Sequence, residues 1–388
     1  MYILGISAYY HDSAACLIFN DEIIAAAQEE RFTRKKQDES FPVNAVKYCL
    51  TQAQISISDL SAIVYYEKPF LKFERLLESY YHFAPLGLVS FVKSIPVWIK
   101  EKLFIKDEIY SQLKQIEDFD KKKIKIYFSE HHLSHAASAF YPSGFESAAI
   151  LTIDGMGEWA SASIAHAKNG KIQILKELHY PNSLGLLYSA FTYFLGFVVN
   201  SGEYKLMGLA PYGIKNSEET EKFKTIIRQK LVEIKPDGSI KLNMKYFGFA
   251  TSLRMIKTKK WQKLFGIKKR NFKDKIIQSH CNLALAIQEI TEEIALNMAR
   301  HAQEITGESQ LCLAGGVALN CVANSEILKS KIFSEIYVQP AAGDAGGALG
   351  AAFSYLYHHK NMEYKPTNKD LMQGSYWGPE FSNFDVLK

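Results

Sequence analysis

Short apolar runs separated by polar turns make up two stretches of the sequence that resemble each other. Three buried strands are predicted in the first stretch, at residues 3–7, 14–19 and 22–27. Three more are predicted in the same order in the second, at residues 149–153, 160–167 and 171–175. The turn after the first strand is polar in both copies and carries His11 in one and Asp154 in the other. This internal duplication predicts two similar α/β lobes, residues 1–148 with a helical insert and residues 149–365, that face each other across a cleft.

After the second copy the pattern changes to a helix and then to alternating strand and helix. Apolar residues spaced by three or four over residues 282–305 predict the helix. Strands at 310–314 and 335–338 each run into a glycine-rich turn, the second of which is residues 343–347, and then into a helix. A helix that begins after such a turn presents free N–H groups and its positive dipole end to an anion. We therefore expect a polyphosphate site between the lobes.

Composition indicates a folded, cytoplasmic protein. The 388 residues are 47% hydrophobic and 22% charged, which excludes a disordered or fibrous chain. The five cysteines lie far apart and include no C-x-x-C pair, so we expect reduced thiols rather than disulfides or a zinc ribbon. The N-terminus has no basic segment ahead of an apolar one, and Pro85, Lys93 and Pro96 interrupt the best apolar run, residues 83–99. We expect neither a signal peptide nor a membrane span.

Charge along the chain is uneven. The net charge of +5 is small for this length and does not by itself indicate nucleic acid as a partner. Residues 254–275, however, hold ten Lys or Arg and one acidic residue, Asp274. The simpler interpretation of this segment is a solvated basic face, and the alternative is a patch that attracts an anionic substrate or a partner.

The sharpest local motif is a pair of histidines, His131 and His135. The residues that follow are small and apolar enough to form a helix, with Ser129 as the expected N-cap, so both imidazoles lie on one helix face. An isolated pair of histidines is more often an ordinary core or surface feature, but such a pair can also bind one divalent ion. Asp154 and Asp344, both in glycine-rich turns, are candidates for a third ligand. Fe²⁺, Zn²⁺ and Mn²⁺ all suit such a set.

Residues 203–213 are predicted to form a loop, because Gly and Pro interrupt their apolar residues. Lys205 in this loop is a candidate phosphate contact. An ordinary surface lysine explains Lys205 equally well.

Together these motifs resemble the O-carbamoyltransferases of the nodulation and antibiotic-tailoring type. The N-terminal part of that family belongs to the actin, Hsp70 and sugar-kinase superfamily and is related to the proteins that transfer threonylcarbamoyl groups to tRNA. The stretches that carry the resemblance are residues 3–15, 29–36, 41–42, 131–137, 154–158, 205–213, 314–320 and 339–347. They lie in the family's order along nearly the whole chain. The resemblance implies an α/β fold of two duplicated RNase H-like lobes, of the actin and Hsp70 type, that face a nucleotide cleft.

The resemblance also implies a reaction and its residues. Family members form carbamoyl adenylate from carbamoyl phosphate and ATP, and pass the carbamoyl group to a hydroxyl of a small-molecule acceptor. By resemblance, His131, His135 and Asp344 would hold a metal, with iron as the expected ion. His11 would face the carbamoyl carbon, and Lys36 would help to hold the anion. The phosphate and nucleotide would be bordered by Asp154, Gly155, Gly157, Lys205, Gly315, Gly316, Val317, Asn320 and Gly343.

The chain departs from the family pattern in two respects. Family members continue into a C-terminal domain that forms the carbamoyl adenylate, and residues 366–388 look like the start of the linker to that domain. The adenylate would then come from a separate domain or subunit, or the chain is a fragment. Gln37 stands where the family commonly has a histidine, which bears on the acceptor more than on the fold.

Other functions stay open at this point. Threonylcarbamoyl transfer to tRNA shares the lobes and the histidine spacing, but the His131-His132 pair and the His11-Asp12 turn match the other branch. A non-catalytic nucleotide-binding subunit is a second alternative. A sugar kinase is a third, which the histidine pair disfavours because such kinases place Mg²⁺ with carboxylates and phosphates. We expect no nucleic acid or membrane partner, and the sequence does not identify the acceptor.

Overall fold

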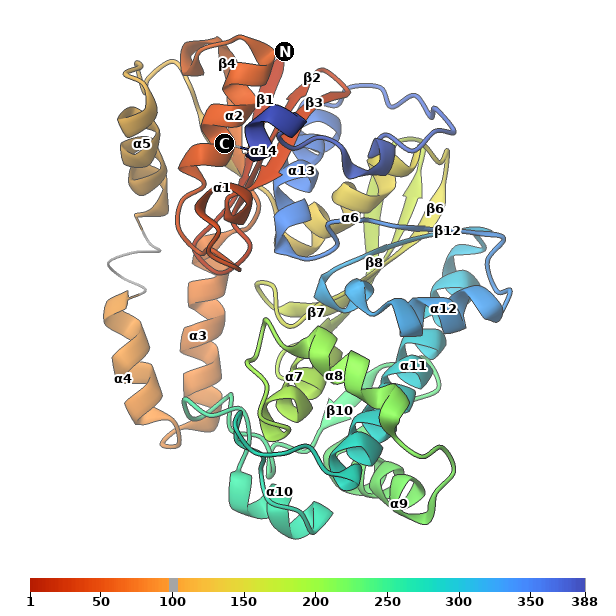
Figure 1. Cartoon of the computed structure of the whole chain (residues 1–388). Coiled ribbons are helices and arrows are strands. Elements are labelled where there is room, and N and C mark those ends of the chain that lie inside the picture. The colour runs from red at the N-terminus through yellow and green to blue at the C-terminus, as the bar shows by residue number, and fades with distance from the viewer. Residues whose placement is uncertain (98–103, 388) are drawn as a thin grey trace.

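The structure is a computed structural model that describes residues 1–97 and 104–387. Within these residues, two five-stranded sheets and a two-stranded ribbon are covered and separated by helices (Figure 1). The ribbon consists of β9 (Val232–Ile234) and β10 (Ile240–Leu242). No helix in the described part of the chain is both long and apolar enough to cross a membrane.

The two large sheets repeat one topology. The first has the order β3-β2-β1-β4-β5 and consists of β1 (Tyr2–Ser7), β2 (Ala14–Phe19), β3 (Glu22–Gln28), β4 (Leu60–Tyr65) and β5 (Ile126–Phe128). The second, read from its antiparallel edge, has the order β8-β7-β6-β11-β12 and consists of β6 (Ala148–Ile153), β7 (Ala160–Lys168), β8 (Lys171–His179), β11 (Gln310–Ala314) and β12 (Glu335–Val338). In each sheet an antiparallel three-stranded meander is extended by two parallel strands. The predicted duplication and the α/β fold of two similar lobes are confirmed.

Helices cover the outer faces of both sheets. Helix α2 (Val43–Ala53) packs on β2 and β3 of the first sheet. The 29-residue helix α11 (Gln278–Thr306) packs on β6 and β7 of the second, where the spacing of apolar residues predicted a helix. The other α-helices are α1 (Glu30–Thr33), α3 (Pro69–Phe83), α4 (Leu88–Val97), α5 (Ile105–Ile116), α7 (Leu184–Phe194), α8 (Glu203–Leu209), α9 (Glu218–Ile226), α10 (Thr258–Phe265), α12 (Cys321–Lys329) and α14 (Asn383–Leu387).

Two helices, α6 (His131–Ser143) and α13 (Asp344–Ser354), pack against each other between the two sheets (Figure 1). Helix α13 lies on β1, β2 and β4, whereas α6 lies on β6, β7 and β11. Helix α6 is rich in Ala and Ser and α13 in Ala and Gly, so their backbones approach closely. A Cβ atom on Gly350 of α13 would lie 1.7 Å from the Ser134 carbonyl oxygen of α6, and one on Gly5 of β1 would lie 1.8 Å from the Ala348 carbonyl oxygen. The stack β1–α13–α6 therefore excludes any side chain at these glycines.

The segment 203–213 differs from its prediction. Instead of a loop it forms α8 and a turn of 3₁₀ helix over Ala210–Tyr212. Leu206 and Leu209 are three residues apart and both are buried, so one helical face packs on the core. This packing outweighs the poor helix propensity of Gly208.

The basic segment 254–275 is partly structural. Trp261 is fully buried, and the guanidinium of Arg270 donates to the carbonyl oxygens of Leu195 at 2.9 Å and Phe272 at 3.0 Å. Lys259 and Lys263 of α10 are exposed, as a solvated basic face requires.

The loop after α1 is tied to the polar turn that carries His11. The amide of Ser13 donates to the Asp38 carbonyl oxygen at 2.9 Å, and the amide of Tyr9 donates to the Glu39 carbonyl oxygen at 2.8 Å. The buried Asp38 carboxylate accepts hydrogen bonds from Thr33 Oγ1 at 2.9 Å and from the Ser40 amide at 3.1 Å. Burial alone would raise the pKa of Asp38, but the hydrogen bonds from Ser40 and Thr33 and the charge of Lys35 lower it to about 2.

Gly350→Ala should destabilise the chain by about 3 kcal/mol, because the new methyl group overlaps the α6 backbone. The matched control is Gly208→Ala, also within a helix, where a Cβ meets nothing within 4 Å. The control should change stability by less than about 1 kcal/mol, in the stabilising direction. Urea unfolding followed by circular dichroism measures both, and equal stabilities of the two variants would contradict this view of the helix contact.

Asp38→Asn should cost about 2 kcal/mol of stability at pH 7, from the difference between the ordinary pKa of 3.8 and the folded value of about 2. Because the pKa is lowered on folding, the carboxylate stabilises the fold above pH 4 and loses this effect as the pH falls toward 2. The difference between the native chain and the variant should shrink over that range. Parallel urea titrations from pH 7 to pH 2.5 test this, with the exposed Asp118→Asn as the control that shows no such trend.

Candidate functional site

Four side chains from three elements converge at the N-terminal ends of α6 and α13. They are His131 and His135 of α6, Asp344 of α13 and Asp154 from the turn after β6, and one ligand atom from each lies within 4.8 Å of the others. The Nε2 atoms of His131 and His135 are 3.0 Å apart. The structure thus brings together the histidine pair and both carboxylates that the sequence offered as ligands.

The carboxylates lie close to the imidazoles. Asp154 Oδ2 is 3.0 Å from His131 Nε2 and 3.8 Å from His135 Nε2. Asp344 Oδ1 is 3.7 Å and 3.6 Å from the same two nitrogens. Asp154 therefore belongs to the cluster as closely as Asp344, whereas the family resemblance gave it the phosphate alone.

Neighbouring groups fix the cluster in place. The Glu158 carboxylate accepts the His131 amide at 3.0 Å, so Glu158 satisfies the free N–H at the start of α6. The N-cap position is Glu130, not the expected Ser129, and it makes no side-chain capping bond. The prediction of a Ser129 cap was wrong, because a carboxylate from a distant turn, that of Glu158, accepts a hydrogen bond from an N–H group at the start of α6. A Cβ atom on Gly157 would lie 3.0 Å from His131 Cδ2, so the turn at Gly157 must be free of side-chain bulk.

The pKa values of the groups in the cluster are shifted in the directions that favour positive charge. Burial would raise the pKa of Asp154, but the imidazoles of His131 and His135 hold it well below its usual range. Burial would lower the pKa of His135, but Asp154 and Asp344 raise it to about 9. The buried carboxylate of Asp344 and the mostly buried carboxylate of Asp154 thus require either protonated imidazoles or another cation between them.

The donor set fits a divalent transition metal. Metal–nitrogen bonds of about 2.1 Å at right angles would separate two ligand nitrogens by roughly 3.0 Å, which agrees with the two Nε2 atoms. The Nδ1 atoms of both histidines are buried and accept or donate no hydrogen bond among the described residues, and Nδ1 of His131 faces Glu67 Oε2 at 3.8 Å. Two imidazoles and two carboxylates are a set that Fe²⁺, Mn²⁺ and Zn²⁺ accept.

His132, which follows His131 in the helix, has a different role from the two cluster histidines. Its Nδ1 lies 2.6 Å from Thr152 Oγ1, which is itself 2.6 Å from Ser163 Oγ. Burial, followed by the neighbouring charges of His131 and His135, lowers the pKa of His132 to about 3. His132 is therefore neutral and anchors α6 to the second sheet.

A cavity of about 210 Å³ adjoins the cluster and shares Asp154 with it. Its walls include the polar turn of the first lobe that carries His11, glycine-rich turns of the second lobe, and residues of α7 and α8. Seven of the sequence-predicted residues line it: His11, Asp154, Gly155, Gly316, Val317, Asn320 and Gly343. The Gly316 amide donates to Asp154 Oδ1 at 3.1 Å, so the second glycine turn is joined to the cluster.

His11 connects the first lobe to this site. Its Nδ1 is 2.9 Å from Asp12 Oδ2, and its Nε2 is 3.8 Å from Asp344 Oδ2. Burial would lower the pKa of His11, but Asp344 and Asp12 raise it to about 9. Asp12 was not selected as a site residue from the sequence. It lies directly after His11 in the same polar turn.

Four predicted residues belong neither to the cluster nor to the cavity wall. Lys36 is exposed, and its Nζ approaches the Tyr204 hydroxyl at 3.3 Å and the ring centroid at 4.4 Å, so it stands over a residue of the wall. Lys205 is exposed and lies 5.8 Å from the same ring. Gly157 packs on the histidines instead, and Gly315 has a φ of 89° and would place a Cβ 2.3 Å from the Ile153 carbonyl oxygen. The two glycines are explained by close packing.

Sequence reasoning missed a group of charged residues beside the cluster. Glu67, Lys72 and Arg75 are buried at the start of the helical insert. The sequence does not select them, because no periodicity in the helical insert distinguishes a buried charge from a solvated one.

Comparison with known proteins agrees with the resemblance seen in the sequence. The family described as Carbamoyltransferase N-terminus matches residues 2–353. The protein sll1178 of Synechocystis sp. is 49% identical over 386 residues, which cover 99% of this chain and 62% of that protein. Nodulation protein NolNO of Sinorhizobium fredii is 36% identical over 380 residues, which cover 97% and 50%. The chain thus spans between half and two thirds of the length of these relatives.

Similarity to solved structures is more distant. The HypF protein of T. kodakarensis is 13% identical with a TM-score of 0.46, covering 96% of this chain and 49% of that one. Component A of the (R)-2-hydroxyglutaryl-CoA dehydratase of Acidaminococcus fermentans is 17% identical with a TM-score of 0.46, covering 93% and 98%. Because the family match extends over residues 2–353, the chain belongs to the family described as Carbamoyltransferase N-terminus.

Proposed function

We propose that the chain transfers a carbamoyl group from carbamoyl adenylate to a hydroxyl of a small-molecule acceptor. The observation that carries this proposal is Asp154, which belongs both to the His/Asp cluster and to the wall of a cavity lined by glycine-rich turns. In a member of this family, such a site suits a nucleotide whose acyl phosphate lies beside the cluster.

The reaction balances as an acyl transfer. The acceptor oxygen forms a bond to the carbamoyl carbon, the bond between that carbon and the phosphate oxygen breaks, and AMP leaves. The hydroxyl proton must leave as the new bond forms. His11, which is hydrogen-bonded to Asp12 in the cavity wall, is our candidate to orient the hydroxyl. Asp344 and Asp12 raise its pKa to about 9, so only the neutral form of His11 would take the hydroxyl proton.

The cluster would hold a divalent ion, and we propose iron. His131, His135, Asp154 and Asp344 are the residues that would bind it. When bound, the ion would stabilise negative charge on the carbamoyl oxygen and on the leaving phosphate. The turn amides that line the cavity, and Lys36 at its rim, would add further positive potential for the nucleotide.

The proposed role of this chain is the transfer step and not the formation of carbamoyl adenylate. The relatives are longer than this chain, and we propose that a further domain or subunit forms the adenylate from carbamoyl phosphate and ATP. Supplying synthetic carbamoyl adenylate therefore tests the transfer step directly.

Asp344→Asn and His131→Ala should each lower carbamoyl transfer from synthetic carbamoyl adenylate by at least about 100-fold, because each removes a metal ligand. The same variants should lose the metal that the purified chain holds, as measured by plasma mass spectrometry. His166→Ala is the matched control, since His166 pairs with Glu308 at 2.7 Å and takes no part in the cluster. Full turnover in either cluster variant would sink the proposal, and tight nucleotide binding without turnover in the native chain would favour a non-catalytic subunit.

Gly155→Val should weaken AMP binding by at least about tenfold while leaving the melting temperature within about 2 °C of the native value. Gly155 lines the cavity, and a Cβ added there meets nothing within 4 Å, so the new side chain occupies ligand space. Isothermal titration calorimetry measures the affinity. Unchanged affinity would show that the nucleotide binds elsewhere.

A further inference from the structure

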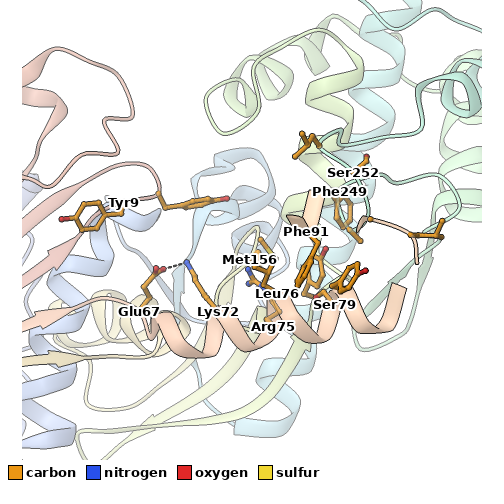
Figure 2. Close-up of a pocket in the computed structure, with 17 residues that line it drawn as sticks. Tyr9, Glu67, Lys72, Arg75, Leu76, Ser79, Phe91, Met156, Phe249 and Ser252 are labelled. Carbon is orange, nitrogen blue, oxygen red and sulfur yellow. Dashed lines mark hydrogen bonds and ion pairs between the residues drawn. The ribbon is translucent and has the colours of Figure 1, made fainter. Parts of the chain in front are cut away.

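A second cavity, of about 390 Å³, lies beside the first and is shown in Figure 2. Tyr10 and Met156 line both cavities, so the two spaces meet at these side chains. Tyr10 precedes His11, and Met156 lies two residues after Asp154 in the polar turn. A molecule in the second cavity would therefore lie beside the two polar turns that carry His11 and Asp154.

Three segments supply most of the wall of the second cavity. Helix α3 supplies Lys72, Arg75, Leu76 and Ser79, which lie along one side of it in Figure 2. The loop 249–253 supplies Phe249 and Ser252 on the other side, and Phe91 of α4 adds a ring that stacks on Tyr80 at 4.0 Å between centroids. Apolar and aromatic side chains, together with Ser79 and Ser252, thus make up the part of the cavity away from the cluster.

Two buried cations stand in this wall. Lys72 is 6% exposed and Arg75 is 8% exposed. Lys72 forms a buried ion pair with Glu67, and this pair is drawn as a dashed line in Figure 2. The charged side chains among the described residues of the wall are these three, so the cavity carries one more positive than negative charge.

Arg75 has donors left for a ligand. Its Nη1 donates to the carbonyl oxygens of Gly157 and Glu158, and among the described residues its hydrogen bonds use Nη1 alone. A guanidinium has five N–H donors, so Nη2 and Nε stay available. Burial lowers the pKa of Arg75 more than the nearby Tyr180, Tyr10, Glu67 and Glu158 raise it. The two carbonyl bonds hold the guanidinium in a fixed orientation in the wall.

We propose that this second cavity binds the acceptor and that the acceptor carries an anionic group, a carboxylate or a phosphate, held by Arg75. The guanidinium of Arg75 suits either anion, because a carboxylate and a phosphate both accept two parallel N–H hydrogen bonds. Leu76, Phe91 and Phe249 would cover an apolar or ring-shaped part of the same molecule. Its hydroxyl would then lie at the junction formed by Tyr10 and Met156. This inference rests on the proposed carbamoyl transfer.

The test compares matched probes that differ in charge. Phenyl β-D-glucuronide and phenyl β-D-glucoside differ by a carboxylate, and glucose 6-phosphate and glucose differ by a phosphate. For the native chain, the anionic member of at least one pair should bind at least about tenfold more tightly, as a charge-assisted bidentate contact provides. Ligand-observed NMR gives the dissociation constants, and the pair that shows the preference identifies the anion.

Substitutions in the wall test whether the preference for the anionic probe arises in this cavity. Arg75→Gln should abolish it, whereas Arg228→Gln, which alters an exposed arginine paired with Glu293, should keep it. Because Arg75 is buried and its variant can misfold, a second pair uses Leu253, a residue of the wall that is 71% exposed. Leu253→Glu should weaken and Leu253→Lys should strengthen binding of the anionic probe, each by about two- to fivefold.

The outcomes separate this inference from the proposed function. Equal binding of both members of each pair, or a preference that persists in folded Arg75→Gln protein and is unmoved by both Leu253 variants, overturns the inference. If the chain turns over carbamoyl adenylate yet shows no preference, the inference alone fails. If it prefers the anionic probe but never consumes carbamoyl adenylate, the assignment of the cavity to an anionic ligand stands and its role as acceptor site falls with the transfer proposal.

Discussion

The close contact between α6 and α13 is the constraint on which the site depends. Because Gly350 meets the Ser134 carbonyl without a side chain between them, the two helices approach at backbone distance in the centre of the molecule. Ser134 lies between the two cluster histidines in the sequence, and Asp344 begins the opposite helix. Any widening of this contact would separate the imidazoles from Asp344. The packing of small residues in the core thus sets the spacing of polar groups at the helix ends.

This arrangement also explains how polar groups survive in a buried site. Two carboxylates and two imidazoles lie at the junction of the lobes, where burial alone would neutralise them. Their mutual attraction keeps the carboxylates charged and raises the pKa of His135 to about 9. Glu158 stabilises the start of α6, and neutral His132 ties that helix to the second sheet. The cluster is therefore held rigidly in a geometry that favours a cation at its centre.

The two cavities divide the surroundings of the cluster into two chemical environments. The first is walled by glycine-rich turns that expose backbone amides, and the second by aromatic side chains with two buried cations. Tyr10 and Met156, which line both, come from the equivalent polar turns of the two lobes. The duplicated fold thereby places one turn from each lobe at the same junction. A transfer reaction needs such a junction, because donor and acceptor must meet at one carbon.

The sequence by itself determined the duplication, the strands of both meanders, the long helix predicted over residues 282–305 and the histidine pair, because each depends on local periodicity or on short turn signals. It also selected seven residues of the first cavity, since these lie in or beside polar or glycine-rich turns that follow predicted strands. Only the tertiary structure decided that Asp154 joins the cluster and that Glu158, not Ser129, serves the start of α6. The second cavity could not be predicted from the sequence either. The burial of Lys72 and Arg75 results from packing between α3 and a turn more than eighty residues away. Contacts between distant segments leave no period in the sequence, so their chemistry emerges only when the chain is folded.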